Sequence, residues 1–242
     1  RNYGIKIATG KYIQFIDGDD YILQAPYEHC LDIVRYHQPD IVTFNYCKKN
    51  KTIEPSYELP TPVTGTYFLK NNNLQGSACS YIFRHSIIGS LQFTPGLIYG
   101  EDEEFTPKLF LRAERIFKTN TEAYFYRDNK NSVSHQYTKE KIQLRMDNSL
   151  EVLLHLQQLL DKLPIAERQA LSRRIAQLSM DYLYNNIRLH HSLISLNQAI
   201  NNLREHGLYP LPDKKYTKKY TMFRRAINTY LGRISLLFFV KK

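Results

Sequence analysis

The 242-residue sequence contains no tryptophan, three methionines and three cysteines. The cysteines, Cys30, Cys47 and Cys79, are odd in number and lack the spacing of a metal site, which argues against a disulfide framework or a zinc module. This usage is typical of a reducing, cytoplasmic environment. No apolar run reaches the roughly 18 residues of a membrane-spanning helix. Apolar residues still make up 43% of the chain, so we expect a globular protein with a real core.

Acidic residues are also scarce, and the formal net charge is +10. Residues 213–242 hold nine basic residues and one acidic residue, hence +8 of that charge. The apolar run 234–240 follows, so residues 216–242 are predicted to form a basic amphipathic helix at an anionic membrane surface. The alternative is a tail that packs on the rest of the protein with solvated lysines. A nucleic-acid role is disfavoured because the charge is confined to the tail and no nucleic-acid motif is present.

Three carboxylates follow a short run of β-formers near the start of the chain. Tyr12–Ile16, bounded by glycines, is predicted to be a buried strand of a mostly parallel sheet, and ligands bind beyond the carboxyl ends of such strands. Asp17, Asp19 and Asp20 lie there, and their mutual repulsion favours a hard divalent cation, Mg²⁺ or Mn²⁺. The alternative is a polar turn. An EF-hand is rejected because Ile22 occupies the position that requires glycine.

A second acidic cluster, Glu101-Asp102-Glu103-Glu104, opens a predicted helix that runs to about Ala113. Acidic residues are favoured in a first helical turn, so a simple charged helix start is the alternative interpretation. Four acids together exceed what capping needs. A carboxylate in such a place suits general-base chemistry.

Three blocks of the sequence, in order, resemble the family-2 glycosyltransferases with the GT-A fold. Residues 1–22 match the family pattern Arg-Asn-x-Gly, then Ala-x-Gly-x-Tyr, an apolar strand and Asp-x-Asp-Asp. Residues 95–105 resemble the family's Glu-Asp motif. Residues 124–127, Tyr-Phe-Tyr-Arg, with Ser-Val-Ser-His at 132–135, resemble the segment that follows it.

The resemblance implies roles for individual residues. Asp17 and Asp19 would hold Mg²⁺ or Mn²⁺ on the donor diphosphate, with Asp20 in support. Asp102 would be the catalytic base, oriented by Glu101. Further donor-site or metal-side residues implied in the same way are Arg1, Arg127, Ser132 and His135, the last as a metal ligand.

The resemblance also implies the domain organisation: an α/β, Rossmann-like catalytic domain followed by a helical region. The chain opens on Arg1-Asn2 without an initiator Met, at a point that part of the catalytic domain precedes in the family. The resemblance therefore implies that the first strands and most of the nucleotide-base pocket are missing. Residues 1–137 are interpreted as a partial GT-A domain, 138–212 as a helical region and 213–242 as the basic tail. Apolar spacing predicts helices over Lys139–Leu163, Ile165–His191 and Leu193–His206.

The resemblance implies a metal-dependent, inverting transfer of a sugar from a nucleoside-diphosphate donor, of which UDP is the commonest nucleotide. The expected acceptor is a glycan or a lipid-linked glycan in cell-surface polysaccharide biosynthesis. Without tryptophan the Gln-x-x-Arg-Trp motif of processive synthases cannot occur, so one sugar per encounter is expected. We expect a cytoplasmic protein, peripheral on the inner face of the plasma membrane. The alternative is a catalytically incomplete fragment that acts only as a membrane-associated or partner-binding module.

Overall fold

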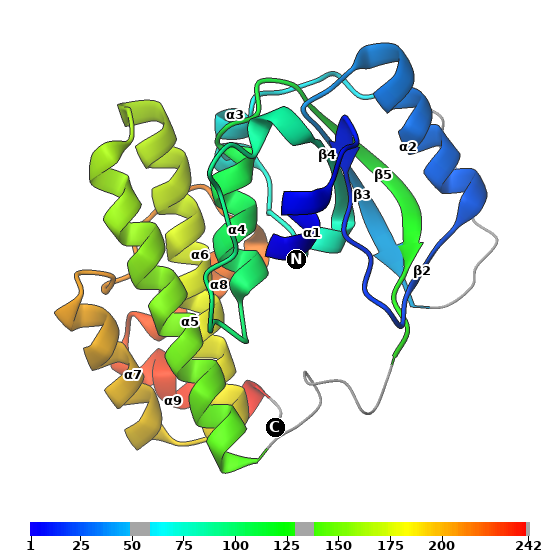
Figure 1. The fold of residues 1–242 in the computed structure, drawn as a ribbon. Coiled ribbons are helices and arrows are strands. Elements are labelled where there is room, and N and C mark those ends of the chain that lie inside the picture. Colours follow the sequence, from blue (N-terminus) through cyan, green and yellow to red (C-terminus); the bar gives the residue numbers. More distant parts are fainter. Residues whose placement is uncertain (49–58, 129–137, 241–242) are drawn as a thin grey trace. The chain divides into compact units, whose positions relative to one another are not determined.

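The computed structural model describes residues 1–48, 59–128 and 138–240 (Figure 1). The chain separates into two compact units. The first comprises residues 1–69, 74–96 and 101–136, and the second comprises residues 70–73, 97–100 and 137–242. The basic tail therefore belongs to the second unit.

The described strands of the first unit form one five-stranded mixed sheet in the order β1-β4-β3-β5-β2. The strands are β1 (Tyr12–Ile13), β2 (Tyr21–Ile22), β3 (Ile41–Cys47), β4 (Tyr81–Arg84) and β5 (Ile116–Phe125). Only β3 and β5 run parallel, and the other pairs are antiparallel. The α/β class is confirmed, but the prediction of a mostly parallel sheet is wrong for the described strands. An apolar run signals burial and does not encode strand direction.

The predicted buried strand at Tyr12–Ile16 is also wrong. Only Tyr12 and Ile13 pair with β4, at an edge of the described sheet, and Ile16 is 49% exposed. Phe15 follows the strand and packs on the rings of Phe93 and Phe105, at centroid distances of 5.5 and 6.5 Å. The apolar character of this run therefore anchors a loop, and that loop carries the first acidic cluster.

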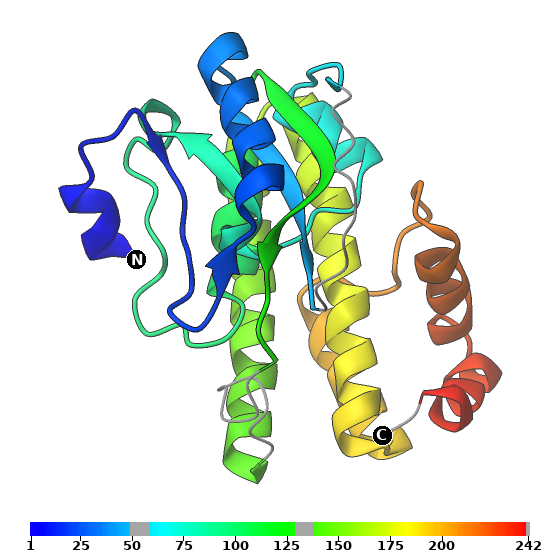
Figure 2. The same ribbon diagram turned by 90° about the vertical axis from the view of Figure 1, so that its right-hand side faces the viewer.

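Helix α2 (Gln24–His37) covers one face of the sheet (Figures 1 and 2). Cys30 and Ile33 of this helix are buried in a cluster that includes Phe44 and Phe117. Burial of a side chain of this size contributes about 2–3 kcal/mol. The helix ends at Gln38, which has φ 44° and precedes a proline that cannot continue the helix.

Helix α4 (Glu101–Phe110) packs on the other face of the sheet, and α3 (Gly65–Asn71) contacts α4 through the rings of Phe68 and Phe110, 5.2 Å apart. Phe110 of α4 contacts Tyr81 of β4 edge-on, at 5.3 Å between ring centroids. The Tyr81 hydroxyl also lies 3.0 Å from the Thr106 hydroxyl. These contacts fix α4 against β4 and so position the acidic first turn of α4.

The second unit is helical. It contains α5 (Lys139–Leu159), α6 (Ile165–His190), α7 (Leu193–Glu205), α8 (Lys218–Ile227) and α9 (Tyr230–Phe239). The first three helices confirm the predicted ones to within a few residues. The prediction of a single tail helix is wrong, because α8 ends at Ile227 and Thr229 caps a new helix by accepting a hydrogen bond from Gly232 N–H.

Within the described ranges, no helix combines the length and the apolar character needed to cross a bilayer.

Candidate active site

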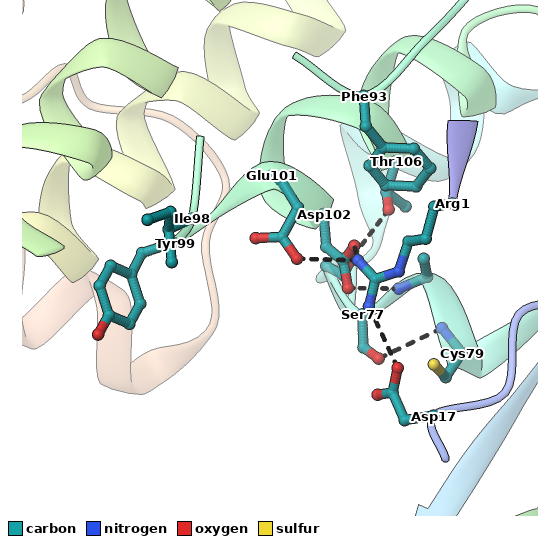
Figure 3. Close-up of polar contacts among 12 residues, drawn as sticks. Arg1, Asp17, Ser77, Cys79, Phe93, Ile98, Tyr99, Glu101, Asp102 and Thr106 are labelled. Atoms are coloured by element: carbon teal, nitrogen blue, oxygen red, sulfur yellow. Dashed lines mark hydrogen bonds and ion pairs between the residues drawn. The ribbon is translucent and has the colours of Figure 1, made fainter. Parts of the chain in front are cut away.

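The guanidinium group of Arg1 joins the two acidic clusters of the first unit (Figure 3). Nη2 lies 3.3 Å from Asp17 Oδ1, and Nη1 lies 2.8 Å from Glu101 Oε1 and also contacts Asp102 Oδ1. Burial by itself would lower the pKa of Arg1, but the charges of Asp102, Glu101 and Asp17 outweigh it, so that pKa is raised. The structure therefore brings together four residues that the sequence assigned to one site.

Arg1 is itself held from its other side. Its guanidinium lies over the ring of Phe93, 5.3 Å from the centroid. The neighbouring Asn2 side chain exchanges two 2.8 Å hydrogen bonds with the backbone of Phe93. Helix α1 (Asn2–Ile7) is thus anchored at the site, and Asn2 is a positioning residue that sequence reasoning missed.

Asp102 is the most enclosed of the three carboxylates around Arg1, with a side chain 19% exposed against 28% for Glu101 and 44% for Asp17. Its second oxygen accepts a hydrogen bond of 3.0 Å from the backbone N–H of Ala78. Burial raises the pKa of Asp102 to about 6, although Arg1 and the Ala78 N–H act against that rise. A carboxylate of this pKa is a stronger base than an ordinary aspartate and is still ionised at neutral pH.

The loop that carries Asp17 is tied to the end of β5 by Tyr124. The Tyr124 hydroxyl accepts a hydrogen bond from Asp17 N–H at 3.1 Å and donates one to Asp20 Oδ2 at 2.7 Å. The other oxygen of Asp20 accepts from Arg127 N–H at 2.8 Å. Asp20 therefore shapes the loop, and its predicted support of a metal site stays a prediction. The sequence showed Tyr124 only as part of an aromatic strand.

Arg127 meets the site through its backbone N–H, and the residue as a whole is exposed. Ser132 and His135 lie outside the described residues, so their predicted roles stay predictions.

Cys79 lies beside Asp17 and Tyr124 and is buried. Burial raises the pKa of its thiol to about 12, so it is not ionised at neutral pH and is not a nucleophile there.

The first acidic loop has side chains that could bind a divalent cation. Both oxygens of Asp20 are engaged, whereas Asp17 is partly exposed and Asp19 is exposed. Across the described ranges, no group of three or more His, Cys, Asp or Glu side chains is arranged to hold a metal ion. Mg²⁺ is commonly bound by one or two carboxylates together with substrate phosphates, so Asp17 and Asp19 fit a cation that arrives with a diphosphate.

Residues 1–88 match the model of the family described as glycosyl transferase family 2. The chain is 30% identical over 146 residues to the glycosyltransferase EpsJ of Bacillus subtilis. The aligned region covers 55% of this chain and 42% of EpsJ. It is 25% identical over 128 residues to the poly(ribitol-phosphate) β-N-acetylglucosaminyltransferase TarS of Staphylococcus aureus. The aligned region covers 52% of this chain and 22% of TarS. The chain thus spans less than half the length of these relatives.

Among solved structures, residues 1–349 of S. aureus TarS in complex with UDP-GlcNAc superpose with a TM-score of 0.65 and 20% identity. The match covers 98% of this chain and 67% of that structure. The complex of the same protein with UDP gives a TM-score of 0.62. At this identity the likeness establishes the fold.

Proposed function

We propose, on the premise that the N-terminal unit belongs to glycosyltransferase family 2 and has the GT-A fold, that this chain is the catalytic part of a glycosyltransferase. The donor is a nucleoside-diphosphate sugar and the acceptor is a glycan in cell-surface polysaccharide biosynthesis.

One observation carries the proposal: Asp17 and Asp102 share the guanidinium of Arg1. Sugar transfer needs a diphosphate-binding group and a proton acceptor on either side of one anomeric carbon, at distances that a single sugar can bridge. Asp17 and Asp102 meet that requirement because both carboxylates contact the guanidinium of Arg1.

In the proposed reaction, Asp102 takes the proton of the acceptor hydroxyl. The hydroxyl oxygen forms a bond to the anomeric carbon as the bond from that carbon to the diphosphate oxygen breaks, so the configuration inverts. The Ala78 N–H and Arg1 hold the Asp102 carboxylate in place, and Glu101 orients it through their shared contact with Arg1. The raised pKa of Asp102 supports the base role.

Asp17 and Asp19 would hold Mg²⁺ or Mn²⁺, which supplies positive charge to the departing diphosphate when bound. The Tyr124 hydroxyl keeps Asp17 in position by accepting a hydrogen bond from the backbone N–H of Asp17. With the diphosphate present, Arg1 contributes a second positive charge at the same place.

We propose UDP as the nucleotide of the donor. The structures of TarS with UDP-GlcNAc and with UDP support this choice through the shared fold. The relatives named above include a poly(ribitol-phosphate) β-N-acetylglucosaminyltransferase, which supports a polymeric acceptor. We propose that the acceptor lies at the inner face of a membrane. We propose that residues 213–242 contact that membrane, and that one sugar is added per encounter.

The test is calorimetry and turnover of UDP-sugars with this chain. We expect the chain to bind a UDP-sugar and to release UDP faster when acceptor is added. Absence of binding would overturn the proposal. Binding without any UDP release or sugar transfer would favour the alternative of a catalytically incomplete fragment.

A further inference from the structure

The second unit contains an apolar groove between α6, α8 and α9, with a volume of about 660 Å³. This volume lies within the range of about 300–1,000 Å³ that is typical of ligand pockets. Its apolar lining comes from all three helices: Met180, Tyr184, Met222, Phe223, Ala226, Leu236, Phe239 and Val240. The carboxylate of Asp181 also lines it, and its two oxygens share the proton of the Tyr220 hydroxyl, at 2.8 and 3.0 Å.

The rim of the groove exposes large apolar side chains to water. Phe239 lines the groove and is 82% exposed, and Phe238 beside it is 81% exposed. Leu231, seven residues before Phe238 and so on the same side of α9, is 78% exposed. Met222 on α8 is 63% exposed. Adjacent exposed side chains of this size mark an interaction surface, because leaving them in water is unfavourable.

Exposed cations lie on α8 beside these apolar side chains. Lys218, Lys219 and Arg225 are exposed, and Lys219 lines the groove itself. Two other basic residues of the tail have internal partners instead: Arg224 pairs with Asp213 at 2.8 Å, and Arg233 donates to the carbonyl of Ile227. Among the described residues of the tail, the exposed cations are therefore Lys215, which precedes α8, and Lys218, Lys219 and Arg225 on α8 itself.

The groove is a built feature, because α8 and α9 are locked together. A Cβ on Gly232 would lie 2.1 Å from the carbonyl oxygen of Ala226, so only glycine permits this close approach. The Arg233 guanidinium also donates to Asn197 and to the Tyr209 hydroxyl, which fixes α9 to the rest of the second unit. The exposed rim is thus held in one place on the second unit.

We infer that the groove between α6, α8 and α9 is a docking site for an anionic phospholipid, with an acyl chain in the groove and the headgroup phosphate at Lys218, Lys219 and Arg225. Apolar side chains beside cations fit a lipid of negative charge, in which an acyl chain and an anionic headgroup are adjacent. The inference deepens the proposed membrane contact and is independent of sugar transfer.

A second copy of the chain fits the groove less well. A symmetric interface through this groove would bring two copies of the cationic α8 into one contact, where their like charges repel. A soluble anion would use the cations but leave Phe238, Phe239 and Leu231 in water. Only the phospholipid satisfies both kinds of side chain.

The absence of tryptophan gives a direct test, because one introduced indole becomes a unique fluorophore. Phe239→Trp is compared with Ile194→Trp, a 74% exposed position on α7 outside the groove. With vesicles of phosphatidylglycerol and phosphatidylcholine, we expect a blue shift and quenching by brominated acyl chains for Phe239→Trp only. Vesicles of phosphatidylcholine alone are expected to give neither effect.

The inference is overturned by no response to either vesicle, by an equal response at both positions, or by a shift that grows with protein concentration without lipid. The last result would assign the groove to a second copy. Lys218→Glu with Arg225→Glu should lower vesicle binding about tenfold or more, whereas Lys139→Glu with Lys162→Glu, also exposed and in the second unit, should not. The assay uses no sugar donor, so its failure leaves the proposed transfer activity untouched.

Discussion

Asp17 and Asp102, from two acidic clusters far apart in the sequence, both contact the guanidinium of Arg1. Each cluster alone has an ordinary interpretation, a polar turn for the first and a charged helix start for the second. Their convergence on one cation is more than either interpretation requires, because neither a turn nor a cap needs a partner from another part of the chain. The site is therefore a junction of the loop after β1, the start of α4 and the start of α1.

The first prediction concerns the proposed base. Asp102→Asn keeps the size of the side chain but removes the proton acceptor, so transfer should fall about 10²–10⁴-fold. Asp32→Asn, an exposed position on α2 that pairs with Arg35, is the matched control and should retain full activity. Steady-state UDP release with acceptor measures both, and normal transfer by Asp102→Asn would show that the base is another group.

The second prediction concerns pH. Burial raises the pKa of Asp102 to about 6, so kcat/KM should rise with pH through about 6 as the carboxylate ionises. Arg1 lowers that pKa and Glu101 raises it. Arg1→Gln should therefore move the acid limb to higher pH, and Glu101→Gln should move it to lower pH. If the acid limb of the pH profile shifts in neither variant, or shifts in the same direction in both, Asp102 is excluded as the titrating group.

The helices of the second unit could be predicted from the sequence because their apolar spacing is long and regular. Residues 139–159, 165–190 and 193–205 each repeat that spacing over several turns, and Pro164 marks one boundary. The two helices of the tail are harder to predict, because basic and apolar residues continue across the break between α8 and α9. The break depends on the Thr229 cap and on the Gly232 contact with Ala226, which are local details of geometry.

The sheet could be predicted as a class but not as a topology. Two-residue strands such as Tyr12–Ile13 and Tyr21–Ile22 carry too little pattern to reveal their partners or direction. The site residues Arg1, Asp17, Glu101 and Asp102 were identified from motifs. Asn2 and Tyr124 lie within the same motifs, but their positioning roles were missed because these depend on contacts with residues far along the chain. Ala78 was missed because it acts through its backbone N–H.

The third prediction concerns the loop after β1. Tyr124→Phe removes the hydroxyl that joins Asp17 N–H to Asp20, so the loop should hold the donor less well. We expect KM for the UDP-sugar to rise about tenfold, which matches the loss of one or two hydrogen bonds at about 1 kcal/mol each. Tyr46→Phe, at a 40% exposed residue of β3, is the control. An unchanged KM would show that the loop needs no such anchor.

The fourth prediction concerns the cation. Thorough chelation should abolish transfer, and Mn²⁺ or Mg²⁺ should restore it, because we propose that Asp17 and Asp19 bind the ion together with the diphosphate. Asp19→Asn should raise the Mn²⁺ concentration needed for half-maximal activity, whereas the surface change Asp161→Asn should not. Activity that survives chelation would remove the role proposed for both aspartates.

The last prediction separates the electrostatics of Asp102 from catalysis. Its pKa is about 6 in the folded protein against an ordinary value of 3.8, so the folded state binds the proton more tightly than the unfolded state. The stabilisation that this proton gives is complete below about pH 4 and is lost as pH rises through about 6.

The amide side chain of the Asp102→Asn variant does not titrate. The stability of this variant relative to the unchanged protein should therefore increase between about pH 4 and pH 7, by up to about 3 kcal/mol. Thermal or urea unfolding across this range measures the difference, and Asp32→Asn serves as the control. A difference that stays constant with pH would mean that burial does not strain this carboxylate, and the argument for Asp102 as a tuned base would lose its physical ground.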